Sequence, residues 1–193
     1  MEEPKGREVI TDFSSPNDFL SNFYMRQIKI HGITFPSSEH AFQALKSDRI
    51  DVVRQFCDPA MSCGRAKKLG RQLNLRKDWE TIKVGLMYAI VRAKFTQHED
   101  LKEMLLETAN KELIEGNKWG DTTWGVCDGE GLNLLGKILM LVRSELCGIK
   151  YDTTRKAADK VAAPKAEPEP KIEKTYAAKE FILSLMKGED NAE

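Results

Sequence analysis

The segment FPSSEHAFQALKSD, residues 35–48, places a carboxylate, an amide and an amine on one side of a short predicted helix. At about 100° per residue, Glu39, Gln43 and Lys46 fall on one arc of that helix. A carboxylate in a pocket can act as an acid or base, and a partly buried lysine has a lowered pKa and becomes a nucleophile. In the alternative interpretation, Glu39 complements the positive helix N-terminus and Lys46 is a solvated charge in the last turn.

A second segment rich in chemical groups is NKWGDTTWGVCDGEGLNLLG, residues 117–136. Its glycines precede a helix that we expect to begin near Leu132, and such a backbone can hold an anion such as phosphate. Trp124 offers a flat face on which a base can stack, and Asp121 and Asp128 are acid or base candidates. The alternative is a turn-rich loop whose tryptophans fill the core, because glycine spacing alone is a weak signal.

A third segment, residues 64–83, carries seven Lys and Arg against two acids. It can bind phosphates. The helical spacing of Arg65, Lys68 and Arg71 instead favours a solvated face.

Composition limits the function classes. Of 193 residues, 41% are hydrophobic, which supports a core, and Lys plus Arg equals Asp plus Glu at 30 each, so no global field attracts nucleic acid or membranes. Four cysteines without CxxC spacing and three histidines are a poor set of metal ligands, and we expect neither metal nor cofactor. The N-terminus lacks the apolar core of a signal peptide, and no run reaches membrane-spanning length, so we expect a cytoplasmic protein with reduced thiols.

The elements that must position these residues indicate an α+β domain in which helices predominate. Residues 7–13 and 23–35 read as strands, the second a hairpin turning near His31-Gly32. Pro59 is expected in the first turn of a helix, where proline is tolerated, and Gly148 at the end of another helix. The predicted helices are 38–46, 51–57, 60–69, 78–96, 100–108 and a buried one within 131–148, and a short strand is predicted at 111–116.

The composition changes near Tyr151, which divides the chain into a domain of residues 1–150 and an appendage. Residues 151–175 are Ala, Pro, Lys and Glu with little to bury, and we expect a flexible, disordered linker. Residues 176–188 form a short amphipathic pattern with Phe181, Ile182 and Leu185 on its apolar side. We expect this helix to dock on the domain or to meet a protein partner.

Five segments in order resemble the YbiA-like family, also called NADAR. They are FLSNFY, FPSSEHAFQALK, GRAKKLGRQLNLRKDWETIKVGLMYAIVRAKFTQ, LLETANKELIEG and WGVCDGEGLNLLGKILMLVR. The resemblance implies a single compact, mostly helical domain that acts on N-glycosidic bonds. Substrates in that family include phosphoribosylamino-pyrimidine intermediates of riboflavin synthesis, and some members remove ADP-ribose from guanine in nucleic acid.

The resemblance also assigns site residues. Glu39, Lys46 and Asp121 are the implied catalytic residues. Val126 and Cys127 stand where many members carry another glycine, so the loop shape that selects the substrate differs here. The implied substrate-binding residues are Asn22, Phe23, Ser38, Gln43, Arg65, Lys68, Trp79, Trp124, Gly125 and Asn133.

The chemistry of an N-glycosidic bond suits this set. A glycosylamine can open to an imine, which an uncharged lysine attacks to give a Schiff base. Glu39 is then placed to take and return protons for Lys46. The expected function is therefore an N-glycosidase for a small nucleotide-like substrate, with ADP-ribosylated nucleic acid as the alternative substrate. A module that binds nucleotides or ADP-ribose without turnover is the non-enzymatic alternative.

Overall fold

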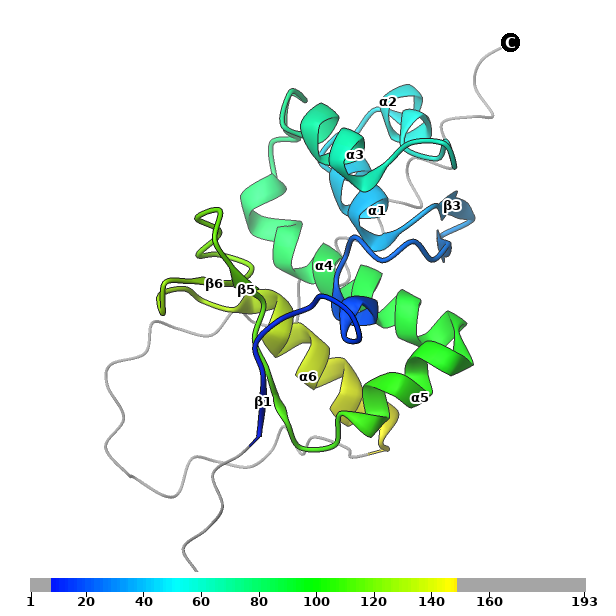
Figure 1. Cartoon of the computed structure of the whole chain (residues 1–193). Coiled ribbons are helices and arrows are strands. Elements are labelled where there is room, and N and C mark those ends of the chain that lie inside the picture. The colour runs from blue at the N-terminus through cyan, green and yellow to red at the C-terminus, as the bar shows by residue number, and fades with distance from the viewer. Residues whose placement is uncertain (1–7, 149–193) are drawn as a thin grey trace, which may run out of the picture.

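The computed structural model describes residues 8–148. A long central helix, α4 (Trp79–Gln97), divides the fold into two parts. On one side lie α1 (Ser38–Ala44), α2 (Ile50–Gln55) and α3 (Cys63–Gly70), and on the other lie α5 (Glu99–Glu107) and α6 (Leu134–Leu146) (Figure 1). The predicted helical α+β class is confirmed for this part of the chain.

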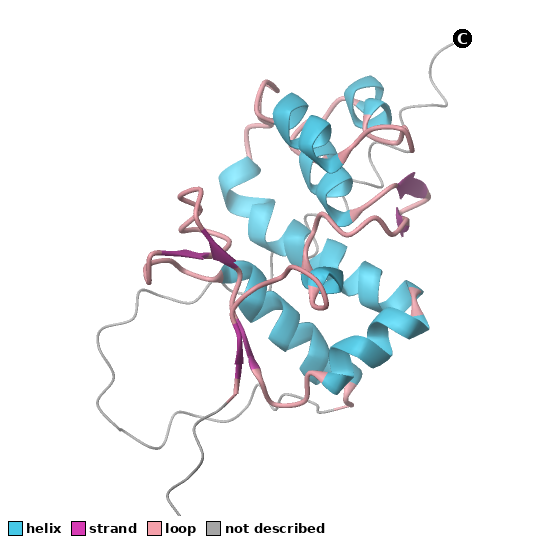
Figure 2. Ribbon diagram, in the orientation of Figure 1, coloured by secondary structure: helices cyan, strands magenta, loops and turns pink. Residues whose placement is uncertain are grey.

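Strands are short and lie outside this helical frame (Figure 2). Within residues 8–148 they form three two-stranded sheets. The first and third pairs are parallel and the second is the antiparallel hairpin. The pairs are β1 (Val9–Ile10) with β4 (Glu112–Leu113), β2 (Ile28–Ile30) with β3 (Ile33–Phe35), and β5 (Gly116–Asn117) with β6 (Val126–Cys127).

The hairpin at His31-Gly32 is confirmed: Ile30 pairs with Ile33 across a two-residue turn. His31 and Gly32 both have positive φ, 45° and 88°, which a two-residue hairpin turn with the strands' own twist requires. By contrast, the single strand expected at 111–116 is divided between β4 and β5, because the chain leaves β1 after Leu113 and pairs with β6 from Gly116.

The start of α3 was predicted wrongly. Helix α3 begins at Cys63 rather than Ala60, because the Ser62 hydroxyl caps it by accepting the Arg65 N–H at 3.2 Å. Pro59 therefore precedes the helix instead of opening it. Its neighbours belong to a turn in which the Asp58 carboxylate accepts the Ala60 N–H.

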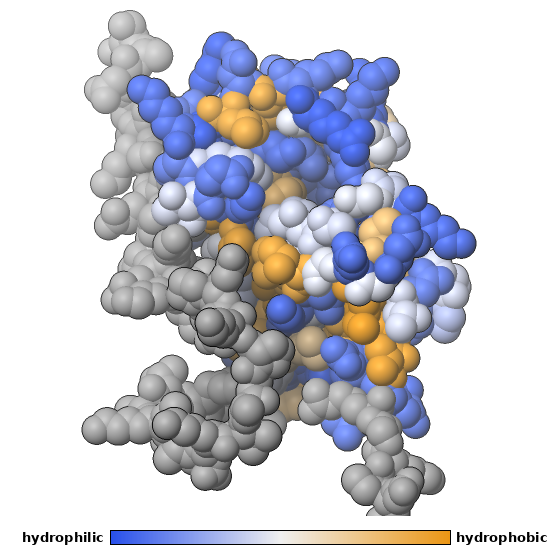
Figure 3. Space-filling model, turned by 90° about the vertical axis from the view of Figure 1, so that its left-hand side faces the viewer, coloured by the Kyte–Doolittle hydropathy of each residue, from blue (hydrophilic) through white to orange (hydrophobic). Residues whose placement is uncertain are grey.

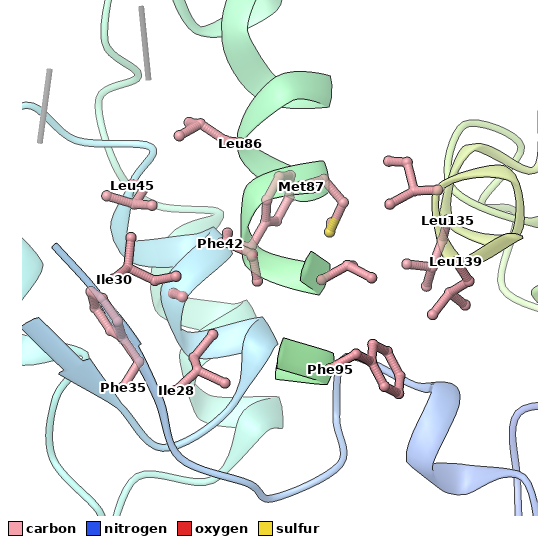
Figure 4. Close-up of a cluster of buried hydrophobic side chains, with 14 of the residues drawn as sticks. Ile28, Ile30, Phe35, Phe42, Leu45, Leu86, Met87, Phe95, Leu135 and Leu139 are labelled. Carbon is pink, nitrogen blue, oxygen red and sulfur yellow. The ribbon is translucent and has the colours of Figure 1, made fainter. Parts of the chain in front are cut away.

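The core is continuous across α4. In Figure 4, Phe42 of α1 and Met87 of α4 lie side by side, and Leu135 and Leu139 of α6 approach from the other side. Every residue of α1 is buried, so this helix is enclosed by the fold on all sides. The polar residues of α1 therefore face other protein atoms or a cavity, and no side of the helix faces bulk solvent.

Lys94, in the last turn of α4, holds the N-terminal segment against the core. Its ammonium is fully buried and donates to the carbonyl oxygens of Phe19 at 2.6 Å and Ser21 at 2.8 Å. Burial lowers the pKa of Lys94 to about 7. These bonds hold the short 3₁₀ helix Asp18–Leu20 and the segment that follows it, residues 21–23, against α4.

No helix within residues 8–148 is long and apolar enough to cross a membrane. The predicted linker at 151–175 and the predicted helix at 176–188 lie outside the described residues.

Candidate functional site

A pocket of about 450 Å³ opens where the N-terminal segment, α1, α3 and the β5–β6 region meet. Its volume is within the range of small-molecule sites, about 300–1,000 Å³. The lining is polar and charged as well as aromatic, with carboxylates and cations facing one space. It comprises Asp12, Phe13, Ser14, Ser21, Asn22, Phe23, Glu39, Phe42, Gln43, Lys46, Lys67, Arg71, Met87, Glu115, Gly116, Trp119, Asp121, Trp124 and Leu135.

Glu39 reaches the pocket from the first turn of α1. The Ser37 hydroxyl caps this helix, and the Glu39 N–H donates to the carbonyl oxygen of Asn22 at 3.0 Å. Its carboxylate is 6% exposed and accepts the side-chain N–H of Gln43 at 2.8 Å. Burial raises the pKa of Glu39, while the Gln43 hydrogen bond and nearby cations act in the opposite direction.

Lys46 enters the same pocket just beyond the end of α1. The side chain is half-buried, and its Nζ lies 5.9 Å from the centre of the Phe42 ring and 5.8 Å from that of Trp79. Burial lowers the pKa of Lys46, the Glu39 carboxylate opposes this, and the charges of Arg71 and Lys67 lower it further. The surroundings thus favour the neutral amine that a nucleophile requires.

Asp121 and Trp124 come from the loop between β5 and β6. Asp121 Oδ1 accepts the backbone N–H groups of Thr123 at 3.1 Å and Trp124 at 2.8 Å. The Trp124 ring meets the Phe42 ring edge to face, with centroids 5.1 Å apart. The shared helix face of Glu39 and Lys46 and the separate 117–136 loop are therefore brought to one pocket, as expected from the sequence.

The expectation that the glycine-rich loop holds an anion at a helix N-terminus was wrong. Helix α6 begins at Leu134 rather than near Leu132, after Asn133 in the left-handed conformation. The N–H groups of residues 132–135 already donate to the carbonyl oxygens of residues 122–125. The donors that would bind phosphate are consumed within the loop.

The sequence departure at Val126–Cys127 forms strand β6, and Asp128 lies in the tight turn that follows it. Val126 N–H donates to the Glu115 carbonyl at 2.8 Å, and Cys127 pairs with Glu130 in both directions. Asp128 occupies the turn with a φ of 51° and is exposed. It does not line the pocket, so the structure gives no support to Asp128 as an acid or base.

The other site residues implied by the family resemblance divide into three groups. Asn22, Phe23 and Gln43 line the pocket. Ser38, Trp79, Gly125 and Asn133 are buried behind its wall. Arg65 and Lys68 are exposed on α3 outside the lining, where they form the solvated face that their spacing favoured.

Several lining residues were missed from the sequence, notably Glu115, Lys67, Arg71, Asp12 and Trp119. Lys67 belongs to the basic segment but lies off the face that was considered, whereas Arg71 was assigned to the solvated face and lines the pocket instead. Glu115 is half-buried, with a buried Oε2 atom, at the end of an apolar strand pattern, and a charge in that position was the available signal.

The pocket mouth carries two exposed aromatic rings. Phe23 is 42% and Trp119 is 64% exposed, and Lys67 Nζ lies 5.5 Å from the first ring centre and 5.8 Å from the second. On the side of the molecule that carries the β5–β6 loop, apolar surface lies among hydrophilic side chains (Figure 3). This mouth pairs a cation with stacking surfaces, a combination suited to phosphate and a nucleobase.

Among residues 8–148, no cluster of three or more His, Cys, Asp or Glu side chains is arranged to hold a metal ion. The described cysteines are free thiols.

Two glycines of α3 make a matched pair for testing the pocket wall. A Cβ on Gly70 would lie 2.0 Å from Gln43 Oε1 and 2.9 Å from Gln43 Cβ, whereas one on Gly64 would meet nothing within 4 Å. Gly70→Ala should therefore lower the free energy of unfolding by about 1–3 kcal/mol through overpacking. It should also reduce turnover, because Gln43 is displaced from Glu39.

Gly64→Ala should instead stabilise the protein by about 0.5–1 kcal/mol, the usual gain in a helix. Urea unfolding followed by circular dichroism checks both variants. Equal stabilisation by the two substitutions would show that α3 does not press on Gln43.

Comparisons with known proteins agree with this geometry. A family model described as the NADAR domain matches residues 9–147, which include every residue of the pocket. N-glycosidase YbiA of Escherichia coli (strain K12) is 38% identical over 146 residues, which cover 72% of this chain and 88% of that protein. A riboflavin biosynthesis protein of Vibrio vulnificus (strain YJ016) is 42% identical over 131 residues, covering 66% of this chain and 35% of its own length.

The fold has a solved counterpart as well. The NMR structure of the E. coli protein YbiA matches with a TM-score of 0.66 at 34% identity, over 78% of this chain and 93% of that one.

Proposed function

The chain belongs to the NADAR family and is a hydrolase of N-glycosyl compounds, and we propose that it cleaves a phosphoribosylamino-pyrimidine of the riboflavin pathway through a Schiff base on Lys46. The observation that carries this proposal is the convergence of Glu39, Lys46 and Asp121 on one pocket. Burial acts on the first two in the required directions: it raises the pKa of the carboxyl and lowers that of the ammonium.

The first half of the reaction exchanges one C–N bond for another. The sugar ring opens when the glycosidic N–H proton is transferred to the ring oxygen, which leaves an imine between the base and the anomeric carbon. The neutral Lys46 amine adds to that carbon and loses a proton to the Glu39 carboxylate, which returns it to the nitrogen of the base. That nitrogen takes a second proton from an acid of the pocket and departs as the free amine, and the sugar remains on Lys46 as a protonated Schiff base.

The second half releases the sugar. Glu39 removes a proton from water as the oxygen adds to the Schiff-base carbon. The carbinolamine collapses to the sugar aldehyde and free Lys46, so the sum is one water consumed for one base and one sugar released. Asp121, which also lines the pocket, supplies a carboxylate suited to stabilise the cationic iminium.

The pocket mouth supports substrate recognition outside the reacting atoms. Lys67 and Arg71 line the pocket and suit a phosphate, and Trp124 is placed to stack a base. The exposed rings of Phe23 and Trp119 around Lys67 favour a second candidate, removal of ADP-ribose from guanine in nucleic acid, because they extend the stacking surface beyond one nucleotide.

The deciding experiment incubates the protein with a phosphoribosylamino-pyrimidine and, separately, with an oligonucleotide bearing ADP-ribosylated guanine. Released base or restored guanine is resolved by chromatography. We expect release from the small substrate. Release from the oligonucleotide alone would favour the second candidate. Tight binding of ADP-ribose without release from either would identify a binding module instead.

A further inference from the structure

We propose that Glu115 is the general acid that protonates the leaving base, so that the site divides proton transfer between Glu115 and Glu39. This inference rests on the proposed function. It begins from a carboxylate that lines the pocket and has a buried oxygen, Oε2, with no hydrogen-bond partner. An unpaired buried carboxylate oxygen is costly, and a proton on the group removes most of that cost.

The main chain around Glu115 is fixed independently of its side chain. Its N–H donates to Asn133 Oδ1 at 3.0 Å, and its carbonyl accepts the Val126 N–H at 2.8 Å. Asn133 also donates to the Leu113 carbonyl at 2.9 Å, so one side chain clamps the strand at two points. A Cβ on Gly125 would lie 2.1 Å from the Glu115 carbonyl oxygen, so a glycine is needed there.

This clamp gives Asn133 and Gly125, which the family resemblance lists as substrate-binding, another role. Both lie behind Glu115 and set its position. They act as positioning residues, and the group that they present to the pocket is the carboxyl of Glu115.

The charges around the two glutamates differ in sign. Burial raises the pKa of Glu39, but the Gln43 hydrogen bond and three cations, Lys67, Lys46 and Arg71, act in the opposite direction. Glu115 is instead faced by carboxylates from three elements: Asp121 of the loop, Asp12 beyond β1 and Glu39 of α1. Lys67 of α3 and the buried Lys94 of α4 are the cations that act on it.

The neighbours of Glu115 suit a carboxyl that holds a proton. Burial and the neighbouring carboxylates raise the pKa of Glu115 to about 7, and Lys67 opposes them. Two carboxyls whose surroundings differ in this way are the usual pattern of an acid and a base in one site. Glu39, with the cations, is the base beside Lys46, and Glu115 keeps the proton for the departing amine.

The step balances without a further reactant. After Lys46 has added to the anomeric carbon and Glu39 has passed the first proton to the nitrogen of the base, the Glu115 carboxyl gives that nitrogen its second proton. The bond between that nitrogen and the anomeric carbon breaks, its electron pair stays with the nitrogen, and the Lys46 lone pair completes the protonated Schiff base. Glu115 regains its proton from the carbinolamine hydroxyl, which derives from the consumed water, as the sugar aldehyde forms.

The test is the isosteric change Glu115→Gln, which keeps the backbone bonds to Asn133 and Val126. In the wild type, kcat/KM should fall above a pH of about 7, because the acid is lost. In the variant this fall in kcat/KM at alkaline pH (the alkaline limb of the pH profile) should disappear. The variant's kcat should be lower by about 10²-fold or more, the usual contribution of a general acid. Glu112→Gln, on the same segment but outside the pocket, is the control and should keep both the limb and the rate.

A second measurement separates this role from a merely structural one. Ribose 5-phosphate, the free aldehyde, forms the Lys46 Schiff base with no leaving amine, and borohydride reduces that adduct. Glu115→Gln should trap ribose 5-phosphate as well as the wild type does while failing to release base from the glycosylamine. A variant that hydrolyses at the wild-type rate with the limb intact overturns the inference, as does equal loss of trapping and release. A wild type that neither releases base nor traps sugar overturns the proposed function itself, and this inference with it.

Discussion

Replacing Lys46 with arginine is expected to lower turnover by about 10⁴-fold or more, the scale seen when a covalent nucleophile is removed. Arginine keeps the positive charge and a similar length, but its guanidinium does not deprotonate in proteins. The half-buried Lys46 amine, by contrast, has its pKa lowered by desolvation, which makes the nucleophilic form available. Single-turnover release of base, measured by chromatography, gives the rate.

Borohydride added during turnover provides the covalent evidence. It should reduce the Schiff base to a secondary amine, so that the wild type gains the mass of the sugar portion on the peptide containing AFQALK, which ends at Lys46. Lys46→Arg should gain nothing. Lys77→Arg, an exposed lysine outside the pocket, is the control and should be trapped like the wild type.

One result would contradict the covalent route. If Lys46→Arg remains active and no adduct forms in the wild type, water attacks the anomeric carbon directly. Glu39 and Asp121 would then be the working pair of carboxylates.

The second large effect is expected for Glu39→Gln, with turnover reduced by roughly 10²–10⁴-fold, the usual size of an acid–base contribution. The amide is nearly isosteric and its oxygen can still accept the Gln43 N–H that Glu39 accepts at 2.8 Å. Ligand binding should therefore be largely retained, which calorimetry with the product sugar phosphate can measure. Loss of affinity in proportion to loss of rate would show that Glu39 binds substrate and does not move protons.

Glu103→Gln, an exposed carboxylate on α5, serves as the control for Glu39→Gln. Its rate and affinity should match those of the wild type.

The parts of the fold that were predictable are those where local chemistry decides. The hairpin at His31-Gly32 has a turn pair that tolerates positive φ, and α4 has a long apolar pattern, so both appear where expected. The helix face shared by Glu39 and Lys46 was also predictable, because the spacing of residues within one helix does not depend on the elements that pack against it.

Glu115 shows why the rest of the site was not predictable. Its role depends on neighbours from three distant segments, and only the folded chain brings Asp12 and Asp121 next to it. The start of α3 was missed for a smaller reason: Pro59 and Ser62 both suit a helix N-terminus, and the Asp58 turn decides between them.

The loop ahead of α6 was read as an anion site because its sequence has the composition of one. Composition does not show which acceptors the backbone N–H groups bond to. In this structure the N–H groups of residues 132–135 donate to carbonyl oxygens within the loop. The hydrogen-bond partner of each backbone N–H is set only when the chain is folded.

That self-bonded loop bears on how the protein can be changed by evolution or redesign. Residues 122–125 are joined to residues 132–135 through main-chain atoms, so side chains along the loop can be exchanged without altering its path, except at Asp121 and Asn133, which bond the backbone, and where Gly125 and Gly131 meet backbone closely. An added or deleted residue inside that span would put four hydrogen bonds out of register together and displace Trp124. Length variation is better tolerated at the tip, near Asp128 and Gly129, where a Cβ on the glycine meets nothing within 4 Å. New specificities in this scaffold should therefore arise by substitution along a loop of constant length.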